Sequence, residues 1–63
     1  MDISLLKVGD RVGTIDGAIV EVLKESEDGR WVLVRYVANA DDPNLIGSED
    51  LCDETELVKA VEA

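Results

Sequence analysis

Apolar residues and turn residues follow one another in an order that predicts two consecutive β-hairpins in the first part of the chain. Residues 6–15 and 18–24 are rich in Val, Ile and Leu, and the pair Asp16-Gly17 separates them. Glycine supplies the positive φ that a tight hairpin turn requires, so this arrangement predicts two antiparallel strands. Residues 25–29, Glu-Ser-Glu-Asp-Gly, predict a second turn. Residues 30–37 are almost continuously apolar, which predicts a third strand covered on both faces over much of its length.

The segment after Val37 is less regular. Residues 39–44 form a polar loop, in which Pro43 disfavours helix at Asp42 and cannot donate to a sheet. Residues 45–51 are expected to supply a short fourth strand, although Gly47 and the charged residues Glu49 and Asp50 weaken the pattern.

The tail has two interpretations. Asp53 followed by Glu56 resembles an N-terminal capping box, and Leu57, Ala60 and Val61 would share one face of a C-terminal helix. Alternatively, residues 53–56 make a single helical turn and residues 57–61 form a last strand. We favour the strand, because a fifth strand beside the first would protect an edge that four strands leave exposed.

Composition supports a β protein. The 63 residues include one Trp, one Tyr and no Phe, and the apolar stock is mainly 20 Ile, Leu and Val residues. Branched aliphatic residues favour strands. We therefore expect residues 1–63 to form one all-β domain, a five-stranded SH3-like small barrel with a short 3-10 turn before the last strand. The alternative is a four-stranded meander with a C-terminal helix.

The order of these elements resembles the SH3-like barrels, which include KOW and Tudor modules and the photosystem I subunit PsaE. The residues that carry the resemblance are 8–12 (Val-Gly-Asp-Arg-Val), Gly17, residues 31–36 and residues 56–58. The fold hosts many functions and assigns none by itself. KOW modules usually carry basic loops, and Tudor modules need an aromatic cage. Trp31 and Tyr36, five residues apart on one strand, would point to opposite faces and could not form such a cage.

Charge is distributed unevenly along the chain. The formal net charge is −9; residues 1–36 carry five basic and seven acidic residues (−2), and residues 37–63 carry one basic and eight acidic residues (−7). Such a surface repels phosphate backbones and anionic membranes. We therefore expect no direct nucleic-acid binding and no membrane binding, and a protein partner with a basic patch.

Catalytic and metal chemistry have little support in the sequence. The chain has no histidine, the commonest general base and a frequent zinc ligand. Cys52 is the only cysteine, which rules out an internal disulfide and fits a cytoplasmic location. Its acidic neighbours would raise the pKa of the thiol, so we expect a buried apolar role. The acidic residues do not have EF-hand spacing. We expect no enzyme activity, no cofactor and no metal.

Three hypotheses for function follow. The first is a small acidic, non-catalytic module that binds a basic surface on a larger protein. The second is a nucleic-acid mimic that inhibits a DNA- or RNA-binding protein, which would require carboxylates lining one face. The third is an accessory subunit of an enzyme or redox complex. Separately, the chain could form a homodimer through Trp31 or the tail. The residues expected to contact a partner are Trp31, Arg35, Tyr36, Asp41, Asp42, Glu49, Asp50, Asp53 and Glu54.

Overall fold

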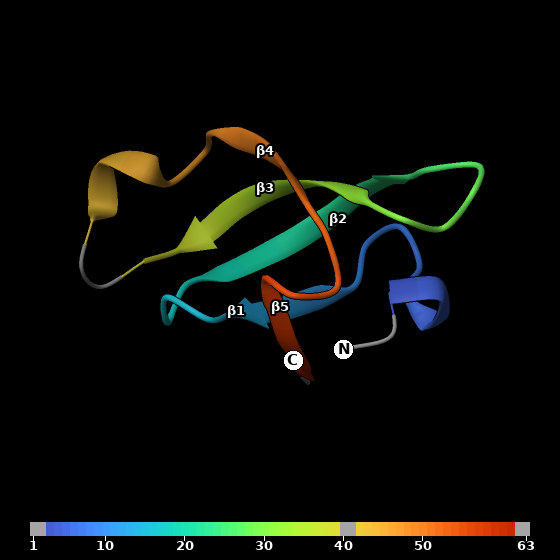
Figure 1. The fold of residues 1–63 in the computed structure, drawn as a ribbon. Helices are drawn as coiled ribbons and strands as arrows, with labels where there is room; N and C mark the ends of the chain where they lie inside the picture. Colours follow the sequence, from blue (N-terminus) through green and yellow to red (C-terminus); the bar gives the residue numbers. More distant parts are fainter. Residues whose placement is uncertain (1–2, 40–41, 62–63) are drawn as a thin grey trace.

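The computed structural model describes residues 3–39 and 42–61, which build one five-stranded antiparallel sheet and two short 3-10 helices (Figure 1). In chain order the elements are η1 (Ile3–Leu5), β1 (Arg11–Thr14), β2 (Ile19–Glu25), β3 (Val32–Ala38), η2 (Pro43–Leu45), β4 (Glu49–Cys52) and β5 (Leu57–Val61). The strand order is β4-β3-β2-β1-β5. The sheet curls into a half-barrel, which confirms the predicted all-β class and is consistent with a small SH3-like barrel.

The C-terminal tail forms a strand. β5 pairs antiparallel with β1, from Arg11 opposite Val61 to Thr14 opposite Leu57. Residues 53–56 make the single turn before it, which is closed by the hydrogen bond from Glu56 N to Asp53 O at 3.2 Å. The predicted fifth strand beside the first is confirmed, and the alternative with a C-terminal helix is wrong.

The predicted Asp-Gly hairpin joins β1 to β2. Gly17 has φ +84°, and Thr14 N donates to Ala18 O at 2.8 Å across the turn. The hydroxyl group of Thr14, a buried polar residue, accepts a hydrogen bond from Ala18 N at 3.1 Å. The turn therefore satisfies its own buried polar groups, as burial requires.

The core lies on the inner side of the curled sheet. Its centre is a set of almost fully buried valines from three adjacent strands: Val12, Val20, Val22, Val32 and Val34. Ile3 and Leu6 from the N-terminal segment pack into the same cluster, together with Cys52 and Leu57. Stiff, β-branched side chains suit a pleated surface, so few residue types suffice for this small core.

β3 is fully covered on its inner face around Val32 and Val34 and partly covered on its outer face. Val32 and Val34 are buried, Leu33 is half-buried and Arg35 is exposed. The predicted cover on both faces is therefore only partial on the outer face, where Leu33 and Val37 are half-buried and Arg35 is exposed. An antiparallel sheet can leave one face partly in water, and from Val32 to Arg35 buried residues alternate with half-buried or exposed ones accordingly.

The loop before β4 contains η2, and the fourth strand begins later than the pattern suggested. Asp42 caps η2 by accepting a hydrogen bond from Asn44 N at 3.2 Å. Residues 45–48 make a turn, in which Ser48 N donates to Leu45 O at 2.9 Å and Gly47 has φ +91°. In Figure 1, η2 and the β2–β3 loop lie at opposite ends of the β2–β3 hairpin.

Candidate partner-binding surface

Three open hollows surround the loop that joins β2 to β3, residues 26–31. One has a volume of about 440 Å³ and is lined by Lys24, Glu25, Ser26, Glu27, Asp28 and Trp31. We call these six residues the Trp31 surface. A second hollow of about 150 Å³ shares four of them and reaches Ile3 and Val32. The third, about 390 Å³, is lined by Ile3, Gly29, Arg30, Asp53, Glu54 and Thr55. The β2–β3 loop is the common wall of all three.

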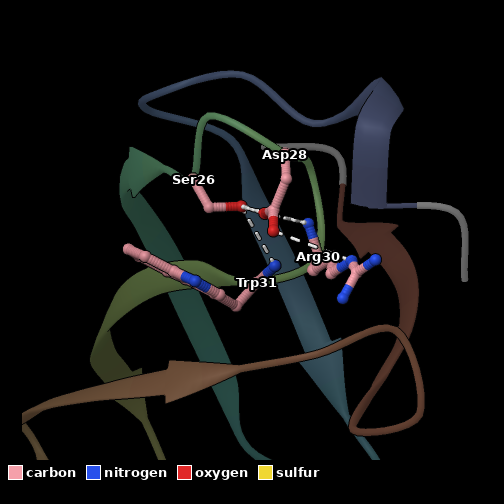
Figure 2. Close-up of polar contacts among 4 residues, drawn as sticks. All are labelled: Ser26, Asp28, Arg30 and Trp31. Atoms are coloured by element: carbon pink, nitrogen blue, oxygen red, sulfur yellow. Dashed lines mark hydrogen bonds and ion pairs between the residues drawn. The ribbon is translucent and has the colours of Figure 1, made fainter.

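The hydroxyl group of Ser26 organises this loop (Figure 2). It accepts hydrogen bonds from Arg30 N at 3.0 Å and Trp31 N at 3.3 Å, and it donates to Asp28 Oδ1 at 2.9 Å. The main chain adds a bond from Ser26 N to Trp31 O at 3.1 Å. Gly29, at φ +70°, supplies the left-handed turn. One hydroxyl group therefore links the end of β2 to the backbone of Trp31.

Asp28 completes the network. Its Oδ1 accepts from Arg30 N at 3.2 Å, and its Oδ2 lies 3.6 Å from Arg30 Nε. The hydrogen bond from Ser26, followed by the bond from the Arg30 backbone, lowers the pKa of the Asp28 carboxyl group. Because this carboxylate faces solvent, its ion pair with Arg30 helps to order the loop but adds little to the stability of the whole chain.

Trp31 presents its ring from this ordered loop. The residue is 36% exposed, whereas its neighbour Val32 is only 1% exposed. In Figure 2 the Trp31 ring extends to one side of the loop, and the Arg30 side chain extends to the other. Tyr36 packs against the core instead. The two aromatic residues therefore have different surroundings, as their expected placement on opposite faces of the strand predicts.

Acidic groups dominate the hollows. In the Trp31 surface, three acidic residues (Glu25, Glu27 and Asp28) accompany one basic residue, Lys24. Asp53 and Glu54 line the third hollow together with Arg30. The fold thus brings two acidic residues of the second half beside an acidic loop of the first half. Sequence reasoning missed residues 25–28 as part of the site, because the first half is nearly neutral overall. The signal that could have revealed them is an acidic turn directly before an aromatic residue.

Asp53 is fixed by its own turn. Its Oδ1 accepts hydrogen bonds from the Thr55 hydroxyl group and from Thr55 N, the latter at 2.9 Å. These two bonds, the hydroxyl bond first, lower the pKa of the Asp53 carboxyl group. A preformed anionic turn therefore stands on the Arg30 side of the loop.

Arg35 and Glu49 lie elsewhere, on the outer face of the sheet. Arg11 lies opposite Glu21, Glu21 opposite Arg35, and Arg35 opposite Glu49. Charges of alternating sign thus cross four strands in register, and Arg35 Nη2 lies 3.8 Å from Glu49 Oε2. Directly opposed residues share a face and interact. These two predicted contact residues therefore already pair with each other.

Tyr36 and Asp50 belong to the inner side of the sheet, at the end distant from the β2–β3 loop. Burial raises the pKa of the Tyr36 hydroxyl group, and electrostatic interactions with the Cys52 side chain and with the carboxylates of Asp50, Asp16 and Glu56 add to the effect in that order. Asp42 caps η2, and Asp41 lies outside the described residues. The eight described contact residues therefore do not form one surface, and among them Trp31, Asp53 and Glu54 border the hollows.

Cys52 is 1% exposed within the core. Burial first, and then the neighbouring Glu56 carboxylate, raise the pKa of its thiol to about 12. The thiol is therefore protonated at neutral pH, and a protonated thiol is a poor nucleophile. The expectation of a buried apolar role for Cys52 is confirmed.

Comparison with known proteins supplies no relative for this surface. No protein-family model, no curated protein and no solved structure matches the chain. In residues 3–39 and 42–61, no group of three or more cysteine or acidic side chains is placed to hold a metal ion. Within the same ranges, no helix has the length and apolar character needed to cross a membrane.

Proposed function

We propose that this chain is a small, acidic, non-catalytic interaction module that binds a basic surface on a larger protein through the Trp31 surface. The observation that carries the proposal is an exposed tryptophan held by a hydrogen-bonded loop among carboxylates. Trp31 is 36% exposed, and Glu25, Glu27 and Asp28 line the same hollow. A basic partner would place an apolar group or a guanidinium plane on the ring and cationic groups on the carboxylates.

In the proposed binding mode, the Trp31 ring and the surrounding carboxylates contribute in different ways. Tryptophan is enriched among residues that dominate binding energy, and cations bind its face. Rim carboxylates mainly raise the association rate and select the sign of the partner. Trp31 N already donates a hydrogen bond to Ser26 Oγ at 3.3 Å. Little ordering of the loop therefore has to occur on binding, which lowers the entropic cost of binding.

The nucleic-acid mimic receives less support. Mimicry requires carboxylates along one face, but here they are dispersed over separate parts of the fold. Glu21 and Glu49 alternate with arginines on the outer face. Asp42 caps η2, and Asp53 lies in the turn before β5. A dispersed pattern fits a module with a local contact better than it fits the imitation of a phosphate backbone.

Affinity purification at low salt tests the proposal. Wild-type chain, Trp31→Ala and Ile46→Ala serve as baits; Ile46→Ala truncates another exposed apolar residue, 51% exposed, which does not line the three hollows. We expect wild type and Ile46→Ala to retain the same basic protein, and we expect its binding to weaken as salt rises. Trp31→Ala should reduce the affinity by roughly thirtyfold or more, as expected for a central aromatic contact.

The proposal fails if Trp31→Ala retains the partner as well as Ile46→Ala does. It also fails if the captured protein is acidic or if its affinity is independent of ionic strength. Circular dichroism of the three baits shows that each is folded, so a loss of binding can be assigned to the surface.

A further inference from the structure

β4 is an edge strand whose outward backbone groups can be identified. Tyr36 N donates to Ser48 O at 2.9 Å, and the register places Val34 opposite Asp50 and Leu33 opposite Leu51. In an antiparallel pair, hydrogen-bonded and non-hydrogen-bonded positions alternate. Asp50 is therefore bonded to β3, and the N–H and C=O groups of Glu49 and Leu51 face the free edge, since β4 ends the sheet.

The outward N–H group of Leu51 is already occupied. Leu51 N donates to Asp50 Oδ1 at 2.8 Å. An incoming strand would need this donor, because an edge strand recruits another chain through its unpaired N–H and C=O groups. The exposed apolar side chain of Leu51, 54% exposed, would otherwise make this edge a suitable place for association.

Like charges also oppose the pairing of β4 with the β4 strand of a second copy of the chain. When two β4 strands pair antiparallel through their outward groups, one residue lies on the two-fold axis. With Asp50 on the axis, Asp50 opposes Asp50 of the other copy. With Glu49 on the axis, Glu49 opposes Glu49, and with Leu51 there, Glu49 opposes Asp53. Directly opposed like charges destabilise a strand pair.

From these observations we infer that Asp50 is a cap on the open edge of the sheet, which prevents a second copy of this chain from adding to β4. Its carboxylate occupies the Leu51 donor and repels an identical edge. Other edge strands are protected by charge and by twist; here one side chain supplies both a charge and a hydrogen-bond acceptor. The inference is independent of the proposed function, because no residue of β4 belongs to the Trp31 surface.

Sedimentation over a range of concentrations tests this inference. Asp50→Ala should self-associate at least roughly tenfold more tightly than wild type, because it gains a free donor and loses a like-charge contact, each worth a few-fold in the association constant. Asp16→Ala, which removes the same charge in the β1–β2 turn, should behave as wild type does. Urea unfolding of both variants separates association of folded chains from aggregation of unfolded ones.

A double variant identifies the donor. Asp50→Ala/Leu51→Pro also removes the outward N–H group of Leu51, and proline is tolerated on an edge strand where its nitrogen faces solvent. We expect this variant to return to the wild-type sedimentation profile. The inference is overturned if Asp50→Ala remains as monomeric as Asp16→Ala, or if the double variant associates as strongly as Asp50→Ala.

Discussion

The hydroxyl group of Ser26 has a larger structural role than its size suggests, because two backbone N–H groups and one carboxylate converge on it. Its bonds to Arg30 N at 3.0 Å and Trp31 N at 3.3 Å join the two sides of the β2–β3 loop. In the proposed binding mode, this order at the Trp31 backbone would lower the entropic cost of contact with a partner.

Ser26→Ala should release the loop. Loss of the acceptor leaves two N–H groups to water, and we expect a cost of about 1 kcal/mol together with faster amide exchange at Trp31. Ser48→Ala is the control, since the Ser48 hydroxyl donates to Leu45 O at the other end of the hairpin. Hydrogen exchange read by NMR compares the two variants, and equal exchange at Trp31 in both would contradict the role of Ser26.

Cys52 gives the fold a stability loss at alkaline pH. Its pKa rises from 9.0 to about 12 on folding, so between these values the folded chain holds a proton that the unfolded chain has released. Stability is therefore fully present below pH 9 and falls as pH rises toward 12. Cys52→Ala should show a shallower fall in urea midpoint over this window, and identical slopes in both proteins would contradict the raised pKa.

At the scale of elements, the turns could be predicted from local sequence, whereas the pairing of strands distant in the sequence could not. The Asp16-Gly17 pair fixed the first hairpin, because positive φ is a property of the residue itself. Residues 57–61 suit a strand or an amphipathic helix alone, and pairing with β1, such as Val12 opposite Ala60, decides between them. η1 was not foreseen, since the burial of Ile3 depends on a core assembled from distant strands.

The first turn should be sensitive to backbone strain alone. Gly17 has φ +84°, and an added Cβ would meet nothing within 4 Å. Gly17→Ala should therefore cost about 1–2 kcal/mol from the left-handed conformation. Gly13→Ala is the matched control, because Gly13 lacks a positive φ and its added Cβ would sit at ordinary contact distances of 3.9 Å. Urea denaturation should show a clear loss for Gly17→Ala only; equal losses would assign the cost to packing.

The row of alternating charges on the outer face should stabilise the pairing of β1, β2 and β3. Glu21→Lys would place three cations side by side, because Glu21 lies between Arg11 and Arg35. We expect a loss of about 1 kcal/mol, and we expect added salt to reduce it. Glu27→Lys makes the same charge change in the exposed loop and should cost much less. A loss that salt does not change would rule out the electrostatic explanation.

For the whole molecule, the charge balance could be read from composition, but the location of the candidate surface could not. The absence of histidine and the acidic balance were available from the sequence. The proximity of Asp53 and Glu54 to residues 26–31 was not, because it depends on how the turn before β5 packs beside the β2–β3 loop. Trp31 was named as a contact residue, but its acidic neighbours Glu25, Glu27 and Asp28 emerged only from the fold.

The half-barrel therefore has two ends with different properties. The end that contains the β2–β3 loop holds the acidic hollows and Trp31, and the other end holds η2 and the β1–β2 turn (Figure 1). β4 ends the sheet with its outward donor at Leu51 occupied by Asp50. Recognition through a loop surface, with the sheet edge protected, is the arrangement that these observations favour.

Selection of peptides from a random-sequence library tests the central claim most directly, because the natural partner does not have to be identified first. The wild-type chain and Ile46→Ala should both select peptides enriched in Lys and Arg that also carry an apolar or aromatic residue. Trp31→Ala should lose them, and added salt should weaken the binding that remains. Peptides without basic enrichment, or the same peptides selected by Trp31→Ala, would contradict a basic partner bound at the Trp31 surface.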